Sequence, residues 1–522
     1  GKAWSRARGV SGGRPGRVRF FLPDSEAAFV RLRLLESARG KGYALDEIAV
    51  ESPEAWENAT RFLEAVARED PRGRWPRSFV GEQIYWTLVG VDAGAEKGLI
   101  SEDGALETGR GAFSLEPFLA SGGRLLGWNE AEIAQSLERG DLPIPAVARR
   151  HAGGLSLETT ALADGPPEAP TLRARYRVRN EGAAPAKVAL YLAVRPVQVN
   201  PPSQWLGAPG GFAPIRSIRR DGAAAVVDGR RIVALTPPSA FGATSWESGE
   251  IVSRLAGDGL PATTEASDPG GLASGALVWN LEIPAGASRD VVVAVPLAGA
   301  SLGDRSADPA ADFQTRLDAA ALAWRGKLDG VAFALPPAAD ETARAMRSNL
   351  GWILINREGP AIQPGSRAYA RSWIRDGALT STALLRLGRF AEVRDFLRWY
   401  APFVYENGAV PCCVDRRGAD PVPEHDSHGE LLYLAGEYFA YTGDHATAEE
   451  VWPTLARVVA HIDALRATRR IEEYLSAQKR VFYGLLPESI SHEGYSARPV
   501  HSYWDDFWAV RGLSAAVELA RA

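Results

Sequence analysis

The chain has 522 residues, of which 46% are hydrophobic and 24% are charged, and its formal net charge is −5. A chain of this length is expected to form roughly two to four domains, each with its own core. It has no block of lysine and arginine to supply the clustered charge that nucleic acid requires, and no apolar run long enough to span a bilayer, so neither partner is expected.

Residues 17–50 contain short β-rich runs, including "AFVRLRLLES" and "YALDEIAV", separated by glycine and aspartate. This part resembles the tail of a coagulation-factor 5/8 type C (discoidin-like) jelly roll. The resemblance implies that residues 1–52 are the end of such a domain. The segment "PEAWENATRFLEAVARED" then predicts a linker helix within residues 53–75.

From residue 76 to 305 the hydrophobic period is two, which is typical of strands. In "TLRARYRVRN" (171–180) apolar residues alternate with four arginines, so one face is expected on a core and the other in water. Further segments such as "KVALYLAVRP" repeat the pattern. We therefore predict a large antiparallel β-sandwich over residues 76–305.

A second linker helix is expected within residues 306–335, and the chain beyond it is almost wholly helical. Helices joined in sequence as hairpins run antiparallel, so every second helix begins at the same end of the array. The second, fourth and sixth helices begin with "RSWIRD", "EHDSHGE" and "HSYWDD", and Arg375 and Asp376 in the first of these are expected to face a pocket. The predicted helices cover residues 341–356, 371–388, 389–404, 427–443, 445–467 and 502–522, and Gly443 is expected to end the fourth.

A β-sandwich, a linker helix and a helical region in this order resemble the six-hairpin (α/α)6 glycosidases, a group that includes bacterial glucoamylases and cellobiose-type phosphorylases. "WIRDGA" matches the Arg-Asp pair of glucoamylase-like chains, which implies that Arg375 and Asp376 hold the terminal sugar. "EHDSHGELLYL" is similar to their fourth-helix motif, with Asp426 and Glu430 in matching places, and His428 is a departure from it.

The same resemblance places the general acid in the loop before the sixth helix, at Glu488 in "GLLPES", where Pro487 departs from the family pattern. Cleavage of a glycosidic bond needs a protonated carboxyl and a second group on the opposite side of the sugar. The apolar surroundings of Glu488 favour a retained proton, and Glu493 is the rival. The second group is not found, and six helices are half of a twelve-helix barrel, so the C-terminal half of the barrel is expected to be missing from 336–522.

We therefore predict a glycoside hydrolase that cleaves gluco-oligosaccharides, with inversion at the anomeric carbon. In the sandwich, a long Pro- and Gly-rich loop carries Trp205, which is predicted to line the sugar site or else to lie in an ordinary surface loop. The predicted substrate-binding residues are Trp373, Arg375, Asp376, Asp426, His428, Glu430, Tyr503, Trp504, Asp505 and Trp205.

Two alternatives stay open. The first is a phosphorylase, which would need basic groups to bind phosphate, and Arg371 and Arg498 are the candidates. The second is a non-catalytic carbohydrate-binding protein, which would need neither a catalytic acid nor a catalytic base. No cofactor and no metal are expected, because "HDSH" at a helix start is more typical of a hydrogen-bonding pair than of a zinc site. The adjacent Cys412 and Cys413 are poorly placed to bridge each other. Localisation is left open, with a periplasmic or secreted bacterial protein favoured over a cytoplasmic one.

Overall fold

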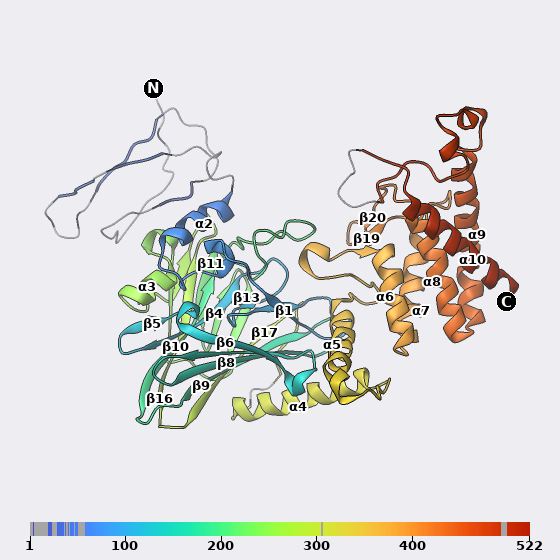
Figure 1. The fold of residues 1–522 in the computed structure, drawn as a ribbon. Coiled ribbons are helices and arrows are strands. Elements are labelled where there is room, and N and C mark those ends of the chain that lie inside the picture. The colour runs from blue at the N-terminus through green and yellow to red at the C-terminus, as the bar shows by residue number, and fades with distance from the viewer. Residues whose placement is uncertain are drawn as a thin grey trace. The chain divides into compact units, whose positions relative to one another are not determined.

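The structure, a computed structural model, divides into two compact units: residues 1–91 with 96–322, and residues 92–95 with 323–522 (Figure 1). None of the described residues before 58 lies in a helix or strand, and most of the predicted discoidin-like segment lies outside the described residues. None of the described helices is long and apolar enough to cross a bilayer. The described residues are 58–303, 306–491 and 498–522, together with 4, 19–22, 29–35, 37, 40, 42–45 and 47–50.

The first unit is built on two large antiparallel sheets, as the alternating pattern predicts. The first sheet has the order β1-β2-β3-β4-β10-β16-β14, with β5 paired to β4, and the second has the order β15-β11-β12-β13-β17-β9-β8-β7-β6. The first sheet comprises β1 (Trp86–Val89), β2 (Gly98–Ser101), β3 (Leu106–Glu107), β4 (Ser114–Ser121), β5 (Arg124–Leu126), β10 (Ala186–Arg195), β14 (Ala240–Thr244) and β16 (Ser274–Ile283). The second comprises β6 (Ala131–Leu137), β7 (Pro145–His151), β8 (Leu155–Asp164), β9 (Thr171–Asn180), β11 (Ser217–Asp221), β12 (Ala224–Val227), β13 (Arg230–Ala234), β15 (Glu265–Ser267) and β17 (Ser288–Pro296).

One hydrophobic core joins the inner faces of both sheets. Leu190 and Leu192 of β10 contribute from one sheet, and Tyr176 of β9 and Val291 of β17 from the other, and all four are fully buried. Successive side chains of a strand point to opposite faces of the sheet. The apolar residues at every second position therefore all point into the core. The unit is therefore a β-sandwich, which confirms the predicted class of this region.

The arginine face of β9 differs from the expectation that it lies in water. Arg173 and Arg175 are buried; Arg173 pairs with Asp164 at 2.8 Å, and α4 (Pro309–Leu328) packs on Arg175. The Nη1 of Arg175 donates to Gln314 of α4 at 3.0 Å, and its guanidinium lies 5.1 Å from the Phe313 ring. Of the four arginines, only Arg179 at the far end of the strand is exposed. Amphipathic alternation thus identified the strand but not the helix that packs on its polar face.

Helices are present within both ranges that were predicted to hold linker helices, and their role as linkers stays a prediction. Helix α2 (Ala59–Glu69) lies within residues 53–75, and the side chain of Asn58 caps it by accepting a hydrogen bond from the backbone N–H of Arg61. Helix α4 lies within residues 306–335. The short helix α3 (Ile251–Gly257), which belongs to the sandwich unit, was not expected.

The second unit carries the six predicted helices. Helix α6 begins at Ile374, within the predicted start "RSWIRD", and follows a short strand over residues 372–373. Helix α8 ends where predicted, since Gly443 adopts the left-handed conformation with φ of 63°. The unit comprises α5 (Asp340–Asn356), α6 (Ile374–Arg386), α7 (Phe390–Tyr400), α8 (Asp426–Thr442), α9 (His445–Ala467) and α10 (Tyr503–Arg521), with a small sheet of β18 (Ser372–Trp373), β19 (Cys413–Asp415) and β20 (Gly418–Ala419).

Helices α8 and α10 pack closely because glycines face each other. A Cβ on Gly429 would lie 2.1 Å from the carbonyl oxygen of Trp508, and one on Gly512 would lie 2.4 Å from the carbonyl oxygen of Gly429. Further along, a Cβ on Gly436 would meet Ala515 at 2.7 Å. The contacts advance in the same direction along both helices, so α8 and α10 begin at the same end of the unit.

We expect Gly429→Ala to destabilise the helical unit by about 1–3 kcal/mol or more, because the added methyl group meets backbone atoms that cannot move without separating the helices. Urea denaturation followed by tryptophan fluorescence measures the change. The matched control is Gly326→Ala in α4, where a Cβ meets nothing within 4 Å and alanine is expected to be neutral or stabilising. Equal stabilities of the two variants would contradict the close helix crossing.

Candidate functional site

The starts of α6, α8 and α10 converge, as hairpin alternation predicts. The Nε of Arg375, in the first turn of α6, donates to Oδ2 of Asp426, the first residue of α8, at 2.7 Å. The indole N–H of Trp504 in α10 donates to the same oxygen at 2.8 Å. Asp505, the next residue of α10, is fully buried. We call Arg375, Glu424, Asp426, Glu430, Trp504 and Asp505 the helix-start cluster.

Within this cluster Arg375 forms hydrogen bonds and ion pairs on several sides. Its Nη2 donates to Glu424 at 3.0 Å and to the carbonyl oxygen of Ser491 at 2.8 Å, and its Nε lies 3.8 Å from Glu430. Burial opposes the charge of Arg375, but the carboxylates of Asp426, Glu430 and Glu424 raise its pKa above the ordinary value. Ion pairing within the protein therefore explains the arginine at this helix start, and sugar binding by Arg375 stays a prediction.

Burial raises the pKa of several carboxyls in the cluster. It raises the pKa of Glu424 to about 7 against the opposing charge of Arg375, and Asp426 adds to the rise. It raises the pKa of Asp505 to about 6, although Ser489 donates a hydrogen bond to Asp505 at 2.6 Å. The pKa of Glu430 is raised well above its ordinary value by burial and by Asp426. The site therefore holds protons near neutral pH.

These raised pKa values determine whether the stability of the helical unit rises or falls with pH. Between the ordinary carboxyl pKa and about 6 to 7, the folded chain binds more protons at Glu424 and Asp505 than the unfolded chain does. The free energy of unfolding of the helical unit is thus expected to fall by about 1–3 kcal/mol between pH 5 and pH 7. Glu424→Gln should flatten this slope and raise the stability at pH 7.

Urea denaturation at the two pH values measures this slope. The control is Glu473→Gln, which changes an exposed glutamate paired with Lys479 in the same unit and should leave the slope as it is. A slope of the opposite sign, or one that Glu424→Gln does not change, would contradict the assigned protonation.

Glu488 does not meet the expectation that desolvation keeps it protonated. Its side chain is 43% exposed, Arg469 donates a hydrogen bond to it, and the Nε2 of His501 lies 3.2 Å from it. Burial alone would raise the pKa of Glu488, but hydrogen bonds from its own backbone N–H and from Arg469, with the nearby positive charge, lower it. In the structure Glu488 is therefore a carboxylate at neutral pH, because its loop is polar where the sequence suggested an apolar setting.

The loop that carries Glu488 is tied to α10 beside the cluster. The backbone N–H of Leu486 donates to Asp506 at 3.0 Å, and its carbonyl oxygen lies 2.8 Å from Nδ1 of His501. Ser491, further along, accepts a hydrogen bond from the backbone N–H of His425 at 2.9 Å. These bonds fix the position of the loop relative to α8 and α10. The rival Glu493 lies outside the described residues.

Exposed aromatic rings lie next to the buried charges. Tyr503 and Trp504 at the start of α10 are 67% and 43% exposed. Tyr369, which is also exposed, packs against the half-buried Trp373 with ring centroids 6.1 Å apart. Aromatic faces of this kind have the amphipathic character that stacks on sugar rings.

Several predicted substrate-binding residues are not accessible. His428 is buried, and its Nδ1 accepts a hydrogen bond from the backbone N–H of Val410 at 3.2 Å. Asp426, Glu430 and Asp505 are fully buried, while Asp376 is half-buried. The residues that can contact a sugar directly are therefore the exposed aromatic residues together with Asp376, Glu424 and Glu488. The fully buried carboxylates instead hold the helix starts together. Trp205 is 74% exposed in the sandwich unit, and its predicted role stays a prediction.

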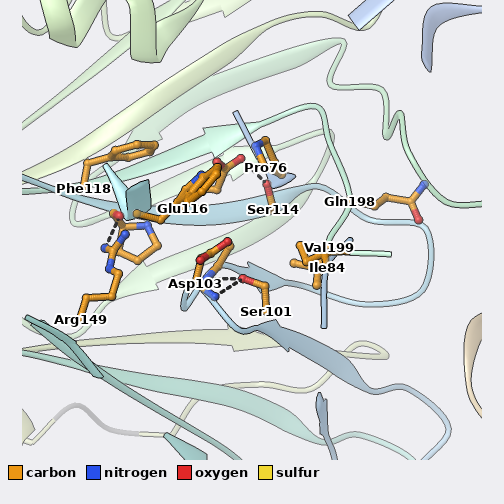
Figure 2. Close-up of a pocket in the computed structure, with 13 residues that line it drawn as sticks. Pro76, Ile84, Ser101, Asp103, Ser114, Glu116, Phe118, Arg149, Gln198 and Val199 are labelled. Carbon is orange, nitrogen blue, oxygen red and sulfur yellow. Dashed lines mark hydrogen bonds between the residues drawn. The ribbon is translucent and has the colours of Figure 1, made fainter. Parts of the chain in front are cut away.

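Two hollows in the structure are lined by residues outside the helix-start cluster. Figure 2 shows the first, inside the sandwich unit, where Asp103, Glu116 and Arg149 are among the lining residues. Its volume of about 20 Å³ suits a water molecule and is too small for a sugar. The second is lined by residues 388–392, Arg394 and Tyr438, at the opposite ends of α6 and α8 from the cluster.

The sequence analysis missed Glu424, Ser489 and Ser491. Glu424 stands in the quoted motif "EHDSHGE", so its nearness to Asp426 was a signal, but its contact with Arg375 depends on the fold. Ser489 and Ser491, whose hydroxyls lie 2.9 Å apart, hold the loop through its own turn. Small hydroxyl residues in a loop carry no pattern that marks such a role.

No protein family profile and no curated protein matches the chain. Among solved structures, a bacterial glucoamylase complexed with acarbose is similar over 84% of this chain and 68% of its own, with a TM-score of 0.50 and 10% identity. A family 92 α-mannosidase from Bacteroides thetaiotaomicron is 9% identical over 73% of this chain and 63% of its own, with a TM-score of 0.33 that carries no weight. The fold of this chain is therefore similar to that of the glucoamylase; a complete (α/α)6 barrel stays a prediction.

Proposed function

We propose that the protein is a glycoside hydrolase that cleaves gluco-oligosaccharides. The observation that carries the proposal is the convergence of three alternate helix starts on one charged cluster, with exposed aromatic rings beside it. This arrangement occurs in a chain folded like a glucoamylase. The terminal sugar is proposed to stack on Trp504 and Tyr503 and to bind Asp376, while Arg375 organises the carboxylates behind them.

Glu488 is proposed as the general acid. It would donate its proton to the leaving glycosidic oxygen while a water attacks the anomeric carbon from the opposite face, with inversion. Its pKa is lowered in the chain alone because hydrogen bonds from its own backbone N–H and from Arg469 outweigh the effect of its partial burial. A sugar ring over this 43% exposed carboxyl would remove the water and raise the pKa towards that of an acid.

The geometry favours hydrolysis over phosphorolysis. Arg371, a candidate phosphate ligand, is paired with Asp415 at 2.9 Å and with Asp420 at 2.6 Å. Arg375 is also paired with carboxylates, so neither guanidinium offers the surplus positive charge that phosphate needs.

The test is an assay of the protein with maltose- and cellobiose-type oligosaccharides, with and without phosphate. We expect release of glucose without phosphate, and NMR of the first product should show the inverted anomer. Release of sugar 1-phosphate only with phosphate would replace the proposal with a phosphorylase. Binding without turnover of any of these sugars would replace it with a non-catalytic binding protein.

A further inference from the structure

The β19–β20 hairpin places two thiols and a carboxylate together. Val414 pairs with Ala419 in the hairpin register, and the backbone N–H of Asp420 donates to the carbonyl oxygen of Cys413 at 2.9 Å. Cys413 and Asp420 therefore stand opposite each other on the two strands, and Cys412 precedes Cys413. Across a hairpin, opposite residues project to the same face.

The ligand atoms of this group converge. The Sγ atoms of Cys412 and Cys413 lie 3.6 Å apart, both cysteines are free, and both are buried. Each thiol offers one sulfur and Asp420 one oxygen, and these atoms all lie within 4.8 Å of one another. Two thiolates bound to one tetrahedral Zn²⁺ at about 2.3 Å would lie about 3.8 Å apart, close to the separation found here. In the described parts of the chain, no other three His, Cys, Asp or Glu residues converge in this way.

We propose that Cys412, Cys413 and Asp420 bind a thiophilic divalent cation, Zn²⁺ in the first place. Two thiolates with one carboxylate favour Zn²⁺ over Mg²⁺ or Ca²⁺, which prefer oxygen ligands only. Binding releases the two thiol protons to solvent, and a water completes the tetrahedron.

The hydrogen bond from Arg371 leaves part of the Asp420 carboxylate available to the cation. Its guanidinium donates to Oδ2 of Asp420 at 2.6 Å, and the backbone N–H of Val422 donates to Oδ1 at 3.2 Å. An ionised carboxylate has about four acceptor sites, so one is available to the cation. Arg371 also pairs with Asp415, whose charge balances it when the cation takes part of Asp420.

The proposed ion would cross-link the hairpin next to the start of α6. Trp373 of β18 pairs with Cys413 of β19, and the backbone N–H of Ile374 donates to the carbonyl oxygen of Cys412 at 3.1 Å. An ion that holds both strands of the hairpin would therefore stabilise the backbone that leads into Arg375. This role is independent of the proposed hydrolase activity.

The test titrates Co²⁺ into the reduced full chain, free of any histidine tag, and follows absorbance. We expect one ion per chain with a thiolate-to-cobalt charge-transfer band that Zn²⁺ displaces, and a higher melting temperature with Zn²⁺. Absence of that band, or visible cobalt bands without thiolate charge transfer, would overturn the proposal. This wild-type titration decides the matter even if a variant does not fold.

The variants then identify the ligands. Cys412→Ser and Cys413→Ser should each lose the charge-transfer intensity of one thiolate, and Asp420→Asn should weaken Co²⁺ binding about tenfold or more. The matched control is Asp415→Asn, which removes the same charge from the same hairpin and from the same Arg371 but is not a ligand. Equal binding by the Asp420→Asn and Asp415→Asn variants, or an unchanged band in either serine variant, would refute the three-residue site.

Discussion

Glu488→Gln is expected to lower the rate of gluco-oligosaccharide hydrolysis by a factor of about 10²–10⁴, because glutamine cannot deliver a proton to the leaving oxygen. The amide keeps the size of the carboxyl, and its oxygen can still accept the hydrogen bond from Arg469. The fold should therefore be preserved while turnover is lost. The measurement is kcat/KM as a function of pH, in which the basic limb of the profile should disappear.

Two variants make this result specific to Glu488. Glu473→Gln changes another exposed, ion-paired glutamate of the loop between α9 and α10 and should leave turnover as it is. Glu424→Gln tests the carboxyl whose pKa burial raises to about 7, which is the value suited to an acid at neutral pH. Full turnover in Glu488→Gln with loss in Glu424→Gln would transfer the acid role to Glu424.

The elements of the fold were predictable because their signals are local. Period-two alternation in β9 and glycine at the end of α8 act over a few residues, so strands, helices and Gly443 were placed correctly. The burial of Arg175 was not predictable, since it depends on where α4 packs. Residues 372–373, at the predicted start of α6, form a strand with β19, and this pairing depends on the fold.

The candidate site was predictable in its position but not in its protonation. Hairpin alternation alone brought Arg375, Asp426 and Asp505 to one end of the helical unit. The number of carboxylates that Arg375 neutralises follows from packing, as the unforeseen contact with Glu424 shows. The exposure of Glu488 likewise depends on Arg469, nineteen residues earlier, which no spacing rule connects to it.

Arg375→Ala is expected to destabilise the helical unit by about 3–5 kcal/mol at pH 7. The guanidinium is the positive charge that faces the buried Asp426 and Glu430 and the half-buried Glu424, and its loss leaves these carboxyl groups without it. Urea denaturation measures the change. Arg394→Ala is the matched control, because Arg394 is paired with Asp395 at the surface, where the expected change is within about 0.5 kcal/mol.

The pH dependence separates an electrostatic role of Arg375 from simple loss of packing. Without the guanidinium, the pKa values of the buried carboxyls should rise further, so the folded variant takes up protons more readily than the wild type. The stability difference between the two proteins should therefore shrink as the pH falls from 7 to 5. A loss that is equal at both pH values would mean that Arg375 acts through its hydrocarbon stem, and the helix-start cluster would then not be held together by charge.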